Sequence, residues 1–326
     1  MALDTATIVA PGTTPGSHAA EPSLGTLFRR ILAAEWTKLR SVRSTTITLA
    51  VTVLVCVGLG ALFCYGMVSR WDQQTPQERS LFDPASFSLN ALFLGQLIIG
   101  ALGVLVISAE YSTGTIRATL GAVPQRRAML AGKAVVFAGV ALLFSLVTCF
   151  AAFLLGQAIL HGKGIGTSLS QPGVLRVVIG GALYLTVVGL LGLGLGTLLR
   201  NSAAGISAVV GLLFVLPILS NFLPSDIRSH VAKYLPAEAG AAIWTLHPRA
   251  SESLSPWVGF GVLCAYALAA LVAGSVVLAR RMPDPQVLIK PRPWLTGWRP
   301  VAVDGALVAC LLALSAPAII TGTLAA

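Results

Sequence analysis

A short polar segment between two long apolar stretches, Glu110-Tyr-Ser-Thr-Gly-Thr-Ile-Arg117, carries the side chains best suited to specific interactions. Glu110 can hold a turn through backbone N–H groups or pair with a basic side chain, and Gly114 permits a tight bend. The hydroxyl groups between them can cap a following helix, which we expect over residues 116–122, before Pro124. Such a rigid, charged segment is suited to contact with another protein.

Basic side chains follow this segment and allow two interpretations. In the first, they belong to one contact site, which comprises Glu110, Tyr111, Thr113, Gly114, Thr115, Arg117, Arg126 and Arg127. In the second, Glu110 marks the boundary between bilayer and water, and the basic residues, Lys133 included, only fix the orientation of the chain. A rigid turn and helix in so short a loop favours the first interpretation, and both stay open.

Enzyme chemistry finds little support in the sequence. Gly132-Lys133 lacks the earlier glycine of a phosphate-binding loop, since Arg127 stands at that position, and Gly156 lies one residue too far from Gly162-Lys163. The five cysteines lie in apolar stretches, and the four histidines have no partner at ligand spacing. We therefore expect no catalytic residues, no metal site and no directly bound cofactor.

The composition places this chain in a membrane. Of its residues, 56% are hydrophobic and only 10% are charged, which is more apolar surface than a soluble core hides. Continuous apolar stretches long enough to cross roughly 30 Å of hydrocarbon as helices predict an all-α polytopic fold. The six expected spans are residues 45–69, 84–109, 133–160, 174–199, 203–223 and 257–279. A candidate seventh, residues 301–324, is interrupted by Pro317.

The distribution of basic residues predicts the orientation. With the N-terminus in the cytoplasm, fifteen lysines and arginines lie on the cytoplasmic side and seven on the other. This bias agrees with the positive-inside rule for six spans in the plasma membrane. It also accounts for the formal net charge of +10 without nucleic-acid binding, because no basic stripe interleaved with aromatic residues is present.

Four regions follow along the chain. Residues 1–24 have the composition of a disordered tail, and residues 25–44 predict a basic amphipathic helix on the inner membrane surface. On this helix Leu27, Ile31, Leu32, Trp36 and Leu39 fall mostly on one face. Residues 45–281 hold the six spans, and residues 282–326 form a proline-rich tail with the candidate seventh.

Few polar side chains lie within the spans. Most are expected to bond to each other or to backbone carbonyls between helices, and a minority to face a transport path, with Gln96, Thr148 and Ser207 as candidates. Gly192 and Gly196 predict close helix packing rather than a nucleotide loop, because no strand precedes them. An apolar path would suit a lipophilic or amphipathic cargo.

The run Glu35-Trp-Thr-Lys-Leu-Arg-Ser-Val-Arg-Ser44, together with residues 110–120, Pro124-Gln-Arg-Arg127 and Lys133, resembles permease subunits of export-type ABC transporters, the ABC-2 class, in the style of actinobacterial members. The resemblance covers residues 27–281. It implies a six-helix permease half that pairs with a second half, identical or different, and with cytosolic ATPase subunits that bind ATP and magnesium. In that family the helix before the first span and the loop between spans two and three contact the ATPase.

Carried onto this chain, the first contact falls on Glu35, Lys38, Arg40 and Arg43. The second falls on residues 110–127. The family's short outer helices are compatible here with residues 226–234 and 237–246, whereas the tail after Arg281 departs from the pattern and leaves the side of the C-terminus open.

Two other classes remain as alternatives. A secondary transporter usually needs ionisable groups near the middle of the membrane, and no acidic residue lies deep within any of the six expected spans. A membrane anchor or assembly protein without transport would use the same polar segment to dock a partner that is not an ATPase.

Overall fold

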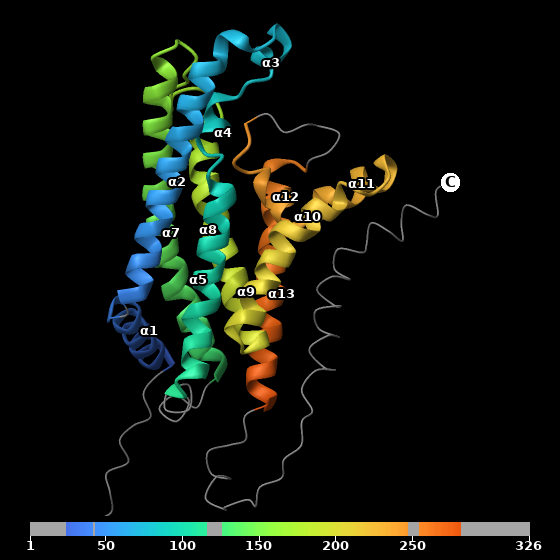
Figure 1. Ribbon diagram of the computed structural model, residues 1–326. Coiled ribbons are helices and arrows are strands. Elements are labelled where there is room, and N and C mark those ends of the chain that lie inside the picture. The colour runs from blue at the N-terminus through green and yellow to red at the C-terminus, as the bar shows by residue number, and fades with distance from the viewer. Residues whose placement is uncertain (1–23, 42, 116–125, 247–253, 282–326) are drawn as a thin grey trace, which may run out of the picture.

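The computed structural model describes residues 24–41, 43–115, 126–246 and 254–281 (Figure 1). Within these ranges every regular element is a helix, so the predicted all-α class is confirmed. The expected N-terminal tail, the helix over residues 116–122 with Arg117, the proline-rich tail and the candidate span 301–324 lie outside the described residues.

Among the residues that the structure describes, six helices are long and apolar enough to cross a membrane, and the predicted six spans are confirmed. Five are α2 (Arg43–Arg70), α5 (Leu92–Ser112), α7 (Arg126–His161), α8 (Val174–Leu199) and α13 (Pro256–Arg281). The remaining span joins α9 (Ser202–Val210), a π-helical turn η2 (Gly211–Val215) and α10 (Leu216–Ser220). Because Pro217 has no N–H to give to the preceding turn, a locally widened helix is expected just before it.

Shorter helices lie at the two ends of the bundle. At one end, here called the α1 end, α1 (Leu24–Ser41) lies beside the first residues of α7. The opposite end carries η1 (Trp71–Gln73), α3 (Pro76–Ser80), α4 (Pro84–Ser88), α11 (Ser225–Val231), η3 (Ala232–Tyr234) and α12 (Pro236–Ala241) (Figure 1). The last three agree with the short helices expected between spans five and six.

The second span differs from its prediction. Instead of one helix over residues 84–109, the chain forms α4, a turn at residues 89–91 and then α5. The Asp83 carboxylate caps α4 by accepting from the N–H groups of Ala85 and Ser86. The Gln157 side chain on α7 donates to the carbonyl of Pro84 at 2.9 Å and holds α4 against the bundle. Hydropathy cannot reveal this break, because residues 84–109 are apolar on both sides of it.

Helix α8 is the most buried of the six spans and packs against α5, α7 and α13. Its glycines allow this: Gly192 meets the backbone of Gly100, and a Cβ on Gly196 would lie 2.9 Å from the Val104 carbonyl oxygen. On another face, a Cβ on Gly194 would lie 2.7 Å from the backbone nitrogen of Leu271 on α13. The predicted close packing through Gly192 and Gly196 is confirmed.

Candidate functional site

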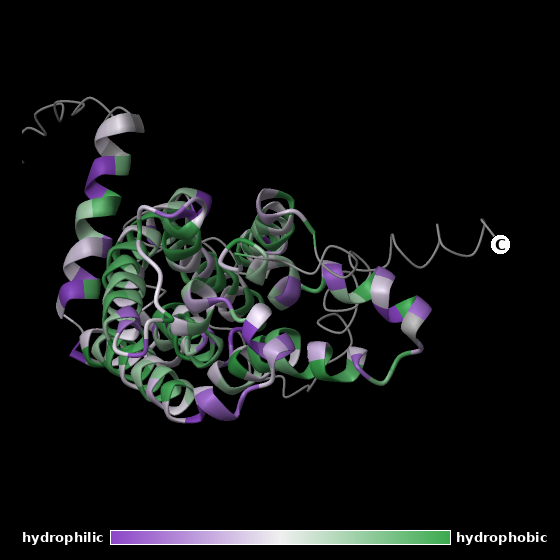
Figure 2. Ribbon diagram, turned by 90° about the horizontal axis from the view of Figure 1, so that it is seen from above, coloured by the Kyte–Doolittle hydropathy of each residue, from purple (hydrophilic) through white to green (hydrophobic). Residues whose placement is uncertain are grey.

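Helix α1 lies across the axis of the bundle, and the view along that axis shows it from the side (Figure 2). Ile31, Glu35 and Leu39 are spaced four residues apart and therefore share one helix face. All three are buried, and α1 packs against α7. Trp36, predicted on the same apolar face, is 51% exposed. The face turned to the bundle is therefore Ile31–Glu35–Leu39, with a carboxylate in its centre.

A cluster of four charged side chains joins α1 to α5 and α7. The Lys133 ammonium group lies 2.5 Å from Glu35 Oε2 and 2.9 Å from Glu110 Oε1. The Lys38 ammonium group lies 3.0 Å from Glu35 Oε1 and 3.2 Å from the same Glu110 oxygen. We call these four residues the charge cluster. Each lysine bridges both carboxylates, so the formal charges balance.

The four side chains of the charge cluster differ in how deeply they are buried. The side chains of Glu35 and Lys133 are each 3% exposed and that of Glu110 is 12% exposed, whereas Lys38 is 40% exposed. A charge removed from solvent is tolerated only when it is paired and hydrogen-bonded. Burial lowers the pKa of Lys38, but hydrogen bonding to Glu35 and the charge of Glu110 outweigh it, so the pKa is raised overall. Lys38 therefore stays charged, and loss of a partner is expected to cost most at the two least exposed members, Glu35 and Lys133.

Backbone packing brings the charges together. Lys133 lies seven residues into α7, about 10 Å along the helix axis. The neighbouring Gly132 faces Ile31 of α1 so closely that a Cβ on this glycine would collide with the Ile31 side chain. The absence of a side chain at Gly132 lets α1 approach until Glu35 reaches Lys133.

The turn after α5 ends that helix. Ser112 and Thr113 both donate their hydroxyl groups to the carbonyl of Ala109, at 3.0 and 2.8 Å. Gly114 has φ +71°, a left-handed conformation that favours glycine. Nothing lies within 4 Å of a Cβ built there, so the requirement for glycine is conformational rather than steric. Thr115, which shares a hydrogen bond with Thr113 at 2.9 Å, is the last described residue before the gap.

Arginines extend the site toward α13. Arg126 donates to the carbonyl of Ala279 at 3.0 Å, and Arg200 donates to the carbonyl of Val277 at 2.8 Å. The Arg200 guanidinium also lies 5.6 Å from the ring centroid of Tyr111. Cations near the last carbonyls of a helix complement its dipole. The end of α13 is thereby held by Arg126, the first residue of α7, and by Arg200, which directly follows α8.

The predicted contact residues thus divide into two groups. Glu35, Lys38, Glu110, Tyr111 and Arg126 make contacts within the subunit. Arg40, Arg43 and Arg127 are exposed at the α1 end, as are Thr113, Gly114 and Thr115.

The three candidate transport-path residues have separate surroundings. Gln96 is fully buried and accepts a hydrogen bond from the Tyr184 hydroxyl. Thr148, buried on α7, donates to the Phe144 carbonyl at 2.7 Å, and Ser207 on α9 is exposed. No hydrogen bond joins these three residues within the described part of the chain, and their role in a transport path stays a prediction.

Sequence reasoning did not include Lys133 or Arg200 in the site. A signal was present for Lys133, because a lysine inside a long apolar helix requires a partner of opposite charge. Glu35, four residues from both Ile31 and Leu39, is the matching carboxylate in an apolar helix face.

Comparison with known proteins supports the resemblance. A family model described as ABC-2 family transporter protein matches residues 31–219, which is more than half of the chain. The match includes all four members of the charge cluster and the helices from α2 to α9. A search of curated proteins gives no match. With six membrane-spanning helices and a match of this extent, the chain belongs to the ABC-2 family of transporter proteins.

Proposed function

We propose that this chain is the permease subunit of an exporter driven by ATP, and that a separate cytosolic ATPase supplies the energy. The α1 end faces the cytoplasm in this proposal. ATP binding closes the ATPase subunits against the exposed basic surface around Arg40, Arg43 and Arg127. A second permease half, identical or different, completes the transport path.

The charge cluster is the observation that best supports the proposal. It links α1, the element that runs along the membrane face, to α5 and α7, the two spans that flank the polar loop. A displacement of α1 therefore acts on both spans through charged contacts that are expensive to break while buried. The ATPase would shift an equilibrium between two arrangements of these spans.

The cargo is proposed to be lipophilic or amphipathic. Support comes from the low content of charged residues in the six spans and from the burial of Gln96 and Thr148 between helices of one subunit. A hydrated path for a strongly polar cargo would be expected to expose such groups.

The first experiment is purification of the full-length chain from its native membranes in mild detergent. We expect an ATPase with a phosphate-binding loop to accompany it, and the complex to hydrolyse ATP faster than the ATPase alone. Uphill solute movement by the chain alone in vesicles, driven only by a proton or sodium gradient, would contradict the proposal.

A matched pair of variants tests the role of α1. Gly132→Ala places a methyl group against Ile31 of α1, whereas Gly139→Ala on the same helix meets nothing within 4 Å. We expect Gly132→Ala to weaken the stimulation of ATP hydrolysis and Gly139→Ala to leave it unchanged. Equal stimulation in both variants would show that α1 docking does not carry the coupling.

A further inference from the structure

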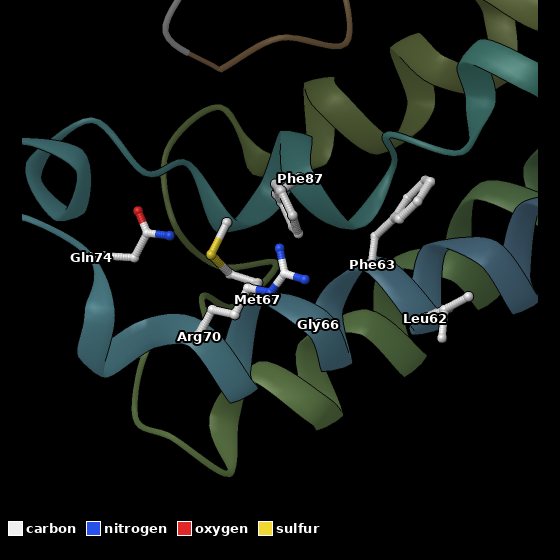
Figure 3. Close-up of a pocket in the computed structure, with 7 residues that line it drawn as sticks. All are labelled: Leu62, Phe63, Gly66, Met67, Arg70, Gln74 and Phe87. Carbon is white, nitrogen blue, oxygen red and sulfur yellow. The ribbon is translucent and has the colours of Figure 1, made fainter.

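A pocket lies at the end of α2 opposite α1 (Figure 3). Its volume is about 340 Å³, and α2 and α4, with the residue that follows η1, form its walls. The lining residues are Leu62, Phe63, Gly66, Met67, Arg70, Gln74 and Phe87.

The pocket is apolar along its length and cationic at one end. Leu62 and Arg70 are eight residues apart on α2, a distance of about 12 Å along the helix. Since α2 spans the membrane and ends at Arg70, the pocket extends from the head-group level into the hydrocarbon by most of one leaflet, about 15 Å deep. Leu62 is 60% exposed and Phe63 is 40% exposed, so the pocket opens sideways to the lipid.

Aromatic contacts fix the wall at head-group level. The Phe87 ring lies 5.3 Å from that of Phe82, which in turn lies 5.2 Å from the ring of Trp71. Aromatic side chains, tryptophan above all, are enriched where a membrane meets water. These ring contacts fix the position of Phe87, which lines the pocket.

No carboxylate lines the pocket, and the acidic groups nearest in sequence have partners of their own. Asp72 pairs with Lys163 at 2.7 Å, Glu78 accepts from Thr75 in a capping box, and Asp83 caps α4. Arg79, the neighbouring cation, lies over the Trp71 ring and donates to the Asp72 carbonyl.

In the part of the chain that the structure describes, Arg70, unlike Arg79, has its charged group unpaired. Within the described residues it has no hydrogen-bond or ion-pair partner, and in Figure 3 its guanidinium extends toward Phe87 and Met67 on the pocket side. A guanidinium at the membrane surface, above an apolar groove and away from carboxylates, is complementary to a phosphate group.

We propose that this pocket binds an anionic phospholipid of the leaflet opposite α1. Arg70 holds the phosphate of the head group, and one acyl chain lies along Leu62, Phe63 and Met67. The bound lipid covers apolar surface that the protein leaves open and fastens the end of α2 to α4. This inference does not depend on the proposed export function.

Native mass spectrometry of the full-length chain tests the proposal, with phosphatidylglycerol and phosphatidylcholine of identical acyl chains as probes. We expect the wild-type chain to retain phosphatidylglycerol preferentially. Arg70→Gln should weaken phosphatidylglycerol binding roughly tenfold, the effect of one lost charge-assisted contact. Arg79→Gln is the control and should leave the preference intact.

A second pair of variants tests the acyl-chain part of the pocket. Gly66 lines the pocket and Gly58 does not, and a Cβ on either meets nothing within 4 Å. Gly66→Leu should therefore fill the pocket without a clash and abolish retention of phosphatidylglycerol, whereas Gly58→Leu should not. Equal retention of both lipids by the wild-type chain, or unchanged phosphatidylglycerol binding in Arg70→Gln, would overturn the proposal.

Discussion

Replacement of Lys133 by methionine is the sharpest test of the charge cluster. Methionine keeps an unbranched side chain, one atom shorter than that of lysine, but removes the charge, and Lys38 is then the remaining cation of the charge cluster. Lys133 and Glu35 are each 3% exposed, and removal of one partner from a buried ion pair costs roughly 3–5 kcal/mol. Since whole domains are stable by about 5–15 kcal/mol, the loss is large enough to measure.

Lys38→Met is the matched comparison. The Lys38 side chain is 40% exposed, and exposed ion pairs contribute about 1 kcal/mol or less. Although both lysines contact the same two carboxylates, we expect Lys133→Met to destabilise the protein several times more. Unfolding in mixed micelles, titrated with a denaturing detergent and followed by tryptophan fluorescence, gives both free energies.

A double-mutant cycle with Glu35→Gln separates pairing from general damage. The double variant Glu35→Gln/Lys133→Met keeps Glu110 beside Lys38, 3.2 Å away, so the charges balance again. We expect it to be more stable than the sum of the single changes predicts, by about 1–3 kcal/mol. Strictly additive effects, or equal losses in Lys133→Met and Lys38→Met, would refute the account of a buried, balanced cluster.

Three further outcomes are expected. Gly196→Ala should lower the unfolding free energy by about 1–3 kcal/mol, because its methyl group would lie 2.9 Å from the Val104 carbonyl oxygen. The control Gly211→Ala, whose methyl group meets nothing within 4 Å, should leave the unfolding free energy unchanged. Equal unfolding curves for the two variants would contradict the packing argument. Asp83→Ala should cost about 1 kcal/mol through loss of the α4 cap, which should appear as faster amide exchange of residues 85–88. Unchanged exchange would exclude that role. Gly114→Ala should lower ATPase stimulation and Gly114→Asn should lower it less, because asparagine tolerates the left-handed conformation; the reverse order would argue against a backbone requirement.

Hydropathy located the six spans because each is a continuous apolar run, and this signal does not depend on tertiary contacts. It missed the break at residues 89–91, where Asp83 and Gln157 hold a short helix in place through specific hydrogen bonds. The glycine pattern around Gly192 predicted close packing correctly, since glycines on one face of a membrane helix let the backbone of a neighbouring helix approach closely.

The charge cluster was predicted only in part. The sequence marked Glu35, Lys38 and Glu110, but Lys133, which pairs with both carboxylates, is separated from Glu35 by 98 residues. No local pattern specifies a contact between segments so far apart. The contact depends on helix packing, because Gly132 leaves the room for Ile31 that lets α1 approach α7.

The two kinds of contact in this chain have different mechanical consequences. Helices α5 and α8 meet backbone to backbone through Gly100 and Gly192, and such interfaces resist sliding because any shift brings main-chain atoms into collision. Helix α1 packs on α7 through Ile31 and Gly132 and is joined to both α5 and α7 at the charge cluster, where long side chains can pivot without loss of pairing. In the proposed exporter a push on α1 would therefore be taken up first as rotation about Lys133 and then be passed to α5 and α8 as one rigid unit. A disulfide between cysteines introduced on α5 and α8 should leave ATP-driven transport intact, whereas a disulfide between α1 and α7 should block it. If only the α5–α8 disulfide abolished transport, the helices that move relative to each other would be α5 and α8 rather than α1 and α7.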